Sequence, residues 1–341
     1  MSIKVAFGAT NLIKGLNNQG IDGIGHYCQE LLNQFATNSF IEITPYSFGY
    51  RANQMTQDFL PSYPQYILKE AANYALTLLS DQKRLSPFGR FDLVHATDQL
   101  IPINVDCPVV ATVMDVIPIT HPHLTPSKLA KLKAYIWKNL SRSADHIITI
   151  SEFSKQEIAK HMNYPQENIS VIPLGVDRRY FDRIDPQVID TVLQKFHLPS
   201  HFFLHVGTIQ PRKNIRQVLE AHAMLPGAYA QQYPLVLAGK YGWGNKAQYK
   251  AIEQAVKEGR CIWINYVTEL EKRALLQSAI GMTFVSLYEG FGLPIVEAFA
   301  SQTPVITSAN SSMIEVAGSA ALLVDPNSTD EIKNALLKII K

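Results

Sequence analysis

Short runs of apolar residues recur along the chain, separated by polar loops and by stretches with helical spacing. The first run covers residues 3–7, and helical spacing follows over residues 24–35. Later runs cover residues 93–94, 109–113, 146–150, 169–172, 202–206, 235–238, 261–264, 282–286, 304–307 and 321–324. Strands that alternate with helices in this way predict an α/β fold, with parallel sheets covered by helices on both faces.

A chain of 341 residues with two series of apolar runs indicates two domains. We expect an N-terminal domain over residues 1–176, a linker over 177–199 and a C-terminal domain over 200–341. Residues 45–90 fit the pattern worst, and we expect helices or loops there. Ligands of open parallel sheets bind beyond the carboxyl ends of the strands, so the chemistry should lie in loops that open onto a cleft between two facing domains.

The composition is that of a globular protein, with 47% apolar and 18% charged residues. The 31 basic and 29 acidic residues nearly balance, which argues against a nucleic-acid partner. The three cysteines are far apart and indicate reduced thiols. We expect a cytoplasmic protein, because no apolar run of about 18 residues and no secretory signal is visible.

One candidate ligand-binding segment runs from Glu289 to Glu297 and follows a predicted strand. Gly290 and Gly292 allow a ligand to approach the backbone, and Pro294 suits the first turn of a helix. The free N–H groups of that turn would attract phosphate, and the two carboxylates could accept from sugar hydroxyls. The alternative is a simple helix start whose acidic residues complement the helix dipole.

A second stretch places Arg212 and Lys213 between a predicted strand and a helix. Cations at the positive end of a helix favour a bound anion, and both side chains are good phosphate ligands. The alternative is a pair of solvated surface cations. The glycine loop over residues 20–25 is a weaker signal, because it matches neither the Rossmann nor the P-loop spacing.

The sequence predicts no metal site. It contains no D-x-D pair, and His121 and His123 are more typical of a surface loop than of a ligand pair.

Together these segments resemble the family 4 glycosyltransferases, retaining enzymes of the GT-B fold. The resemblance rests on the ordered motifs E-G-F-G-L-P-x-x-E (289–297), G-T-x-x-P-R-K-N (207–214) and L-A-G-K-Y-G-W-G (237–244). Shorter matches extend it, at residues 23–27, 115–118, 150–155, 171–177, 304–308, 315–318 and 324–326.

The resemblance implies two facing Rossmann-like domains and a nucleotide-diphosphate sugar as donor, with no metal or other cofactor. The implied catalytic residues are Arg212, Lys213, Glu289 and Asp115, of which the two cations would neutralise the departing diphosphate.

The implied donor contacts come from both domains. Glu297 would hold the ribose, the Tyr266–Val267 loop would lie near the base, and Glu289 with the backbone of Phe291, Gly292 and Leu293 would grip the sugar. The loop containing Gly23 and Gly25 would approach the diphosphate. The acceptor would be a hydroxyl of a polysaccharide or glycolipid.

Two departures from the family pattern bear on activity. Met114 stands where the family usually has a histidine that touches the donor sugar, so we hypothesise a donor without that hydroxyl, such as a 6-deoxyhexose, beside mannose. A shifted alignment or an impaired enzyme are the alternatives. The chain stops at Lys341, and we expect the usual final helix that crosses back to the first domain to be absent.

Residues 128–142 combine basic side chains, Lys128 to Arg142, with an apolar stripe. A solvated face on a core-packed helix is one interpretation, and attraction to an anionic membrane surface at the inner face of the membrane is the other. Two further functions stay open: a catalytically silent nucleotide-sugar-binding subunit and a two-domain binding protein for a small ligand.

Overall fold

The computed structural model describes residues 2–17, 20–48, 65–67, 91–97, 101–102, 105–124, 135, 137–139, 141–243 and 246–341. The chain divides into two compact units, the first made mainly of residues up to Ile172 and the second mainly of Pro173–Lys341. The second unit includes the stretch 177–199 that we expected as a linker. Its helix α7 (Pro186–Lys195) contributes Val192 to the hydrophobic core of that unit.

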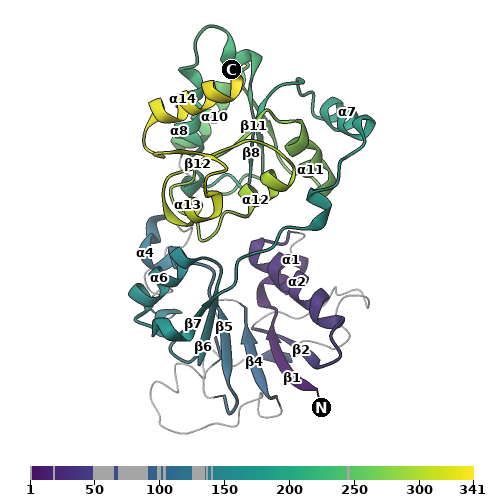
Figure 1. The fold of residues 1–341 in the computed structure, drawn as a ribbon, viewed down its shortest axis with the longest axis vertical. Coiled ribbons are helices and arrows are strands. Elements are labelled where there is room, and N and C mark those ends of the chain that lie inside the picture. The colour runs from purple at the N-terminus through teal and green to yellow at the C-terminus, as the bar shows by residue number, and fades with distance from the viewer. Residues whose placement is uncertain are drawn as a thin grey trace. The chain divides into compact units, whose positions relative to one another are not determined.

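The first unit contains a seven-stranded parallel sheet in the order β3-β2-β1-β4-β5-β6-β7, as far as the structure describes it (Figure 1). Its core lies on both faces of the sheet, since Phe7 packs with the first helices and the neighbouring Ala6 packs on the opposite side. The strands are β1 (Ile3–Gly8), β2 (Ile41–Phe48), β3 (Gln65–Ile67), β4 (Leu93–Ala96), β5 (Val109–Thr112), β6 (His146–Thr149) and β7 (Ile169–Val171). The helices are α1 (Thr10–Asn17), α2 (Gly23–Ala36), α4 (Ile117–Thr120) and α6 (Glu152–Met162).

Three of these elements differ from the sequence prediction. Helix α1 lies between β1 and α2, where we expected only a glycine loop. Strand β2 includes residues 45–48, and β3 lies at 65–67, so the expectation of helices or loops over 45–90 was wrong for these residues. Pro45 argued against a strand in the sequence, because proline cannot donate a hydrogen bond to a neighbouring strand. In the structure it nevertheless lies in β2, opposite Phe7 of β1.

The second unit contains a six-stranded parallel sheet in the order β10-β9-β8-β11-β12-β13 among the described residues. Its strands are β8 (Phe203–Val206), β9 (Leu235–Ala238), β10 (Cys261–Ile264), β11 (Gly281–Phe284), β12 (Val305–Ser308) and β13 (Leu322–Val324). The helices that follow α7 are α8 (Ile215–Ala223), α9 (Tyr229–Gln232), α10 (Lys246–Lys257), α11 (Glu269–Ser278), α12 (Leu293–Ala300), α13 (Ser311–Ala317) and α14 (Thr329–Ile340). The predicted α/β class with parallel sheets is confirmed.

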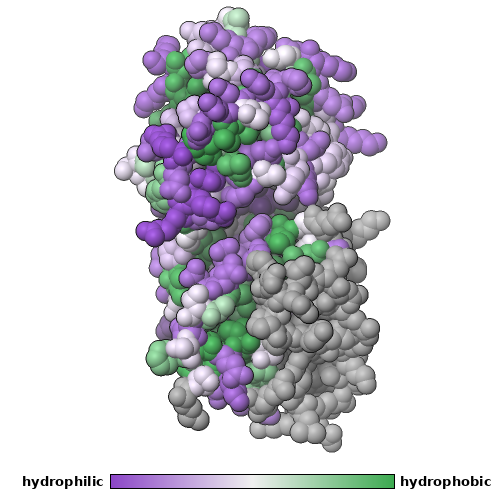
Figure 2. Space-filling model, turned by 90° about the vertical axis from the view of Figure 1, so that its right-hand side faces the viewer, coloured by the Kyte–Doolittle hydropathy of each residue, from purple (hydrophilic) through white to green (hydrophobic). Residues whose placement is uncertain are grey.

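Successive residues of β8 point to opposite faces of this sheet. Phe203 packs with α8, α10 and α14, whereas Leu204 packs with α11, α12 and α13 (Figure 1). Hydrophilic side chains predominate on the face of this unit that Figure 2 shows, so most large apolar residues lie inside. The continuous apolar strands in the sequence are therefore strands buried on both faces.

The strand order reverses between β8 and β11. The chain runs from β8 outward through β9 and β10, then returns to place β11 on the other side of β8. The loops after β8 and β11 therefore leave the sheet at a topological switch point, where ligands bind in open α/β sheets.

Two further observations concern membrane-spanning helices and disulfide bonds. Within the described parts of the chain, no helix has the length and apolar character needed to cross a membrane. The three cysteines are free thiols.

Candidate functional site

The loops after β8 and β11 bring Arg212, Lys213 and Glu289 together. Arg212 and Lys213 lie on a short 3-10 turn (Pro211–Lys213) in the segment between β8 and α8. Asn214 follows with a left-handed backbone (φ 56°), which separates this turn from the helix. The backbone N–H of Leu287 donates to the carbonyl of Arg212 at 2.7 Å and ties the two loops to each other.

Glu289 binds both cations at once. Lys213 Nζ lies 2.7 Å from Glu289 Oε1, and the guanidinium of Arg212 pairs with Oε2. Lys213 and Glu289 are buried, each with 7% of its surface exposed, and Arg212 is partly buried. Neither cation is therefore the solvated surface charge that the sequence left open.

The pKa values of Lys213 and Glu289 both lie below their ordinary values, for different reasons. Burial lowers the pKa of Lys213 to about 8, although Glu289 opposes the shift. Burial alone would raise the pKa of Glu289, but the charges of Lys213 and Arg212 outweigh it and hold that pKa at about 2. At neutral pH the trio thus carries two positive charges and one negative charge, an excess suited to an anion.

The ammonium of Lys213 is held by apolar as well as ionic contacts. Its Nζ lies 4.3 Å from the centroid of the Phe284 ring, a cation–π distance. Its Cε would lie 3.6 Å from a Cβ on Gly207, whose φ of +138° favours glycine. His205 stays neutral beside it, because burial and then the charge of Lys213 lower the pKa of His205 to about 4.

The glycines of the L-A-G-K-Y-G motif serve the packing of two loops. A Cβ on Gly239 would lie 1.9 Å from the carbonyl oxygen of Gly207, and a Cβ on Gly242 would lie 2.4 Å from that of Ile209. Ile209 also forms a parallel bridge with Tyr241. Glycine at these positions lets the loop after β9 lie against the loop that carries Arg212 and Lys213.

Two serines at the start of α13 hold the loop that carries Glu289. Ser312 Oγ donates to the carbonyls of Glu289 and Phe291 at 2.9 and 3.0 Å, and the N–H of Glu289 donates to Ser311 Oγ at 3.3 Å. Neither serine was predicted from the sequence to belong to the site. Their position just after the predicted strand 304–307 was the available signal, because it places them at the same edge of the sheet.

The first turn of α12 follows this loop. Gly292 caps it with a φ of +101°, no side chain accepts a hydrogen bond from this end, and Pro294 occupies the first turn. Leu293 is the first residue of the eight-residue helix. Backbone N–H groups of an uncapped first turn favour an anion.

Glu297 lies on the same helix and contacts Lys272 of α11. Lys272 Nζ is 2.9 Å from Glu297 Oε1. Burial raises the pKa of Glu297, and the charge of Lys272 opposes that shift. Glu297 was among the predicted site residues, whereas Lys272 was not.

Tyr266 and Val267 follow β10 and differ in exposure. The Tyr266 side chain is 65% exposed, and Lys240 Nζ lies 4.7 Å from its ring centroid. Val267 packs against the core cluster that contains Leu204. The exposed ring of Tyr266 can therefore offer a stacking surface to a ligand.

Gly23 and Gly25 lie in the first turn of α2, in the first unit. Asp22 caps this helix by accepting a hydrogen bond from the N–H of Gly25 at 2.8 Å. A Cβ on Gly25 would lie 2.6 Å from Ile21 Cγ2, whereas a Cβ on Gly23 would meet nothing within 4 Å. Packing therefore explains Gly25 and leaves Gly23 without a steric reason.

Met114 and Asp115 follow β5 in the same unit. Asp115 Oδ1 accepts a hydrogen bond from the N–H of Ile117 at 3.0 Å, at the start of α4. The carbonyl of Met114 accepts from Ser154 Oγ at 3.0 Å. Both residues are partly buried.

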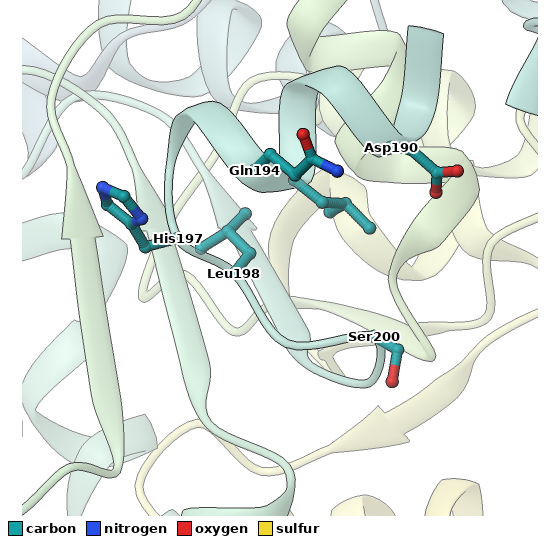
Figure 3. Close-up of a pocket in the computed structure, with 6 residues that line it drawn as sticks. Asp190, Gln194, His197, Leu198 and Ser200 are labelled. Atoms are coloured by element: carbon teal, nitrogen blue, oxygen red, sulfur yellow. The ribbon is translucent and has the colours of Figure 1, made fainter. Parts of the chain in front are cut away.

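Three other features bear on the predicted sites. No group of three His, Cys, Asp or Glu residues that could hold a metal occurs among the described residues, and metal independence stays a prediction. The basic face over 128–142 lies largely outside the described residues, which include only its members Lys138 and Arg142. The hollow in Figure 3, lined by residues of α7 and the loop after it such as His197, includes none of the predicted site residues.

The fold and the site thus define an α/β protein with a cationic cluster beyond the ends of its strands. Two family models match the chain: glycosyl transferases group 1 over residues 194–341, and glycosyltransferase family 4 over residues 21–180. The O-antigen chain mannosyltransferase B of Escherichia coli is 30% identical over 94% of this chain and 87% of its own length. The O-antigen chain mannosyltransferase RfbU of Salmonella typhimurium is 28% identical over 75% of this chain and 67% of its own length.

Solved structures share the fold. The Anabaena protein HepE in complex with UDP and glucose has a TM-score of 0.66 at 18% identity, covering 99% of this chain and 90% of its own. WaaG, a glycosyltransferase involved in lipopolysaccharide biosynthesis, has a TM-score of 0.71 at 16% identity, covering 98% and 90%. The chain belongs to the family 4 glycosyltransferases, has the GT-B fold and is a glycosyltransferase, as the sequence predicted.

Proposed function

We propose that this glycosyltransferase moves mannose from a nucleotide-diphosphate sugar to a hydroxyl of a saccharide or lipid-linked acceptor. The observation that carries the proposal is the trio of Arg212, Lys213 and Glu289 at the switch point, with its excess positive charge. The names of the two O-antigen mannosyltransferases support mannose as the sugar and a polysaccharide as the acceptor.

The trio supplies the electrostatic part of the reaction. As the bond between the anomeric carbon and the phosphate oxygen breaks, negative charge develops on the diphosphate. Arg212 offers a forked donor and Lys213 a compact charge, and both stabilise this leaving group without a metal. Glu289 holds the two cations in position before the donor arrives, and its remaining lone pairs can accept from a sugar hydroxyl.

The transfer retains the anomeric configuration in this proposal. The acceptor oxygen bonds to the anomeric carbon on the face from which the diphosphate departs, and the acceptor proton passes to a departing phosphate oxygen. No protein nucleophile is needed. Asp115 completes the catalytic set that the family resemblance implies.

The remaining donor contacts follow the family pattern. The first turn of α12 supplies N–H donors to an anionic group, Glu297 accepts from the ribose, and the loop of Tyr266 and Val267 lies near the base. The loop of Gly23 and Gly25 approaches the diphosphate.

Met114 favours a second donor. Methionine cannot form the strong hydrogen bond that a histidine would give to a sugar hydroxyl. A 6-deoxyhexose has no hydroxyl there and would lose no hydrogen bond when methionine replaces histidine. Mannose has that hydroxyl and would lose its hydrogen bond to the histidine. Turnover of mannose and 6-deoxyhexose donors by the natural chain and by Met114→His decides between them, and a natural chain that prefers the deoxy donor overturns the mannose assignment.

The proposal also covers the acceptor and the place of the enzyme in the cell. A lipid-linked acceptor would place the enzyme at the cytoplasmic face of the membrane, attracted through the basic residues between Lys128 and Arg142. Sedimentation with liposomes with and without anionic lipid tests this attraction, and equal, salt-insensitive partitioning would contradict it.

Binding and turnover test the proposal as a whole. A thermal-shift screen with nucleoside diphosphates and their sugars should give a stabilisation that Arg212→Ala reduces. Release of nucleoside diphosphate should depend on an acceptor. No response to any nucleotide would overturn the proposal, and binding without turnover would identify a silent subunit instead.

A further inference from the structure

Glu297 is a buried carboxylate whose pKa is raised above its ordinary value. Only 7% of its surface is exposed, and burial is the largest influence that raises its pKa. A protonated carboxyl is a poorer acceptor for ligand hydroxyls, because one oxygen then carries a proton and acts as a donor. Whatever keeps Glu297 ionised therefore affects how well this site can accept hydrogen bonds.

Three groups face Glu297 from two elements. Lys272 and Glu269 belong to α11, and Tyr180 belongs to a 3-10 turn (Arg178–Tyr180) that precedes α7. Lys272 stabilises the charged carboxylate most, the hydroxyl of Tyr180 adds a smaller stabilisation, and Glu269 disfavours the charged form by like charge. Lys272 thus supplies the positive charge that opposes burial and Glu269 in setting the pKa of Glu297.

Lys272 is itself held in place by several contacts. Its Nζ lies 2.9 Å from Glu297 Oε1 and 3.2 Å from Glu269 Oε1. It also lies 5.2 Å from the centroid of the Tyr180 ring. The hydroxyl of Tyr180 donates to Glu269, which fixes the ring beneath the ammonium. This arrangement fixes the ammonium, and it directs Lys272 to only one of the two oxygens of Glu297.

We propose that Lys272 is a positioning residue of the nucleotide site: it binds Oε1 of Glu297, places a positive charge beside the carboxylate and leaves Oε2 to accept from the ligand's vicinal hydroxyls. The proposal rests on the proposed function, because it deepens the role of Glu297 in binding a nucleotide sugar. It assigns to α11, through Lys272, a part in donor binding that no motif in the sequence marks.

The test compares nucleotide affinity at several pH values in the natural chain, in Lys272→Met and in Lys272→Arg. Lys272→Met removes the opposing charge, so the pKa of Glu297 should rise further. Affinity for a nucleoside diphosphate should then fall at least about tenfold at pH 6 and by about twofold or less at pH 8. Lys272→Arg keeps the charge and should follow the natural pH profile.

A matched control is Lys195→Met. Lys195 pairs with Glu271, which is on the same helix α11 but is a different carboxylate. This variant should leave the pH profile of binding unchanged. A Lys272→Met variant that loses affinity equally at every pH would reduce Lys272 to a structural role and overturn the inference.

A second measurement separates this inference from the proposed function. Carbon-13 NMR of side-chain carboxyls, with the Glu297 signal assigned from Glu297→Gln, follows the titration of Glu297 without any ligand. A raised pKa in Lys272→Met together with no nucleotide binding by the natural chain would sink the proposed function alone. Nucleotide binding by the natural chain with an unmoved Glu297 titration would sink the inference alone.

Discussion

Lys213 and Glu289 form a buried ion pair, with 2.7 Å between Nζ and Oε1, across the two loops that flank the switch point of the second sheet. The two residues are 76 positions apart in the chain. A buried ion pair is weak support for stability in itself, but loss of one partner leaves an uncompensated charge. Substitution of Lys213, which we propose binds the diphosphate, should therefore also lower the stability of the second unit.

Removal of Lys213 should destabilise the protein more than removal of a surface lysine. Lys213→Met leaves Glu289 buried with Arg212 as its remaining partner, and we expect a loss of about 3 kcal/mol in the free energy of unfolding. Lys333→Met breaks an exposed pair with Asp330 and should cost less than about 1 kcal/mol. Denaturant unfolding of the two variants measures this difference, and equal losses would contradict the burial argument.

Acid should weaken the fold through Glu289. Its pKa is held at about 2 in the folded protein, against an ordinary value of 4.5, so the stability it contributes is present above about pH 4.5 and is lost as the pH falls toward 2. Glu289→Gln removes the carboxylate that would take up a proton on unfolding in acid. Unfolding free energies measured from pH 6 to pH 3 should therefore fall less steeply in Glu289→Gln than in the natural chain, and parallel curves would rule the mechanism out.

Nucleotide binding should weaken in mild alkali. Lys213 has a pKa of about 8 in the free protein, so it loses its positive charge as the pH rises through that value. Affinity for a nucleoside diphosphate should decline between pH 7 and pH 9. Lys213→Arg keeps its charge at both values and should show a flatter profile in titration calorimetry. A decline of the same size in this variant would point to another titrating group.

Two glycine substitutions should differ strongly in their effect on stability. Gly239→Ala places a Cβ 1.9 Å from the carbonyl oxygen of Gly207, so the backbone must shift, and we expect a loss of about 3 kcal/mol. Gly23→Ala meets nothing within 4 Å and should change stability by less than about 0.5 kcal/mol. Thermal unfolding checks both expectations.

Because Gly23→Ala should leave the fold intact, its nucleotide affinity gives a direct test of the predicted approach of this loop to the diphosphate. Unchanged affinity would argue against that approach.

Local sequence patterns were sufficient for much of the fold. Runs such as Leu235–Ala238 and Cys261–Ile264 are strands with the expected bounds, because a strand buried on both faces must be apolar at every position. The pattern failed at β2, where Pro45 interrupts it, and at the short β3. The bounds of such elements depend on a partner strand, which local composition does not specify.

The sequence by itself determined the class of chemistry, because glycines, cations and carboxylates that follow strands must gather at one edge of a parallel sheet. Only the tertiary structure decided how those charges are paired. It joined Glu289 to both Arg212 and Lys213, and it set Lys272 against Glu297. Ion pairs between residues distant in the chain depend on strand order and burial, and neither can be read from the spacing of residues along the chain.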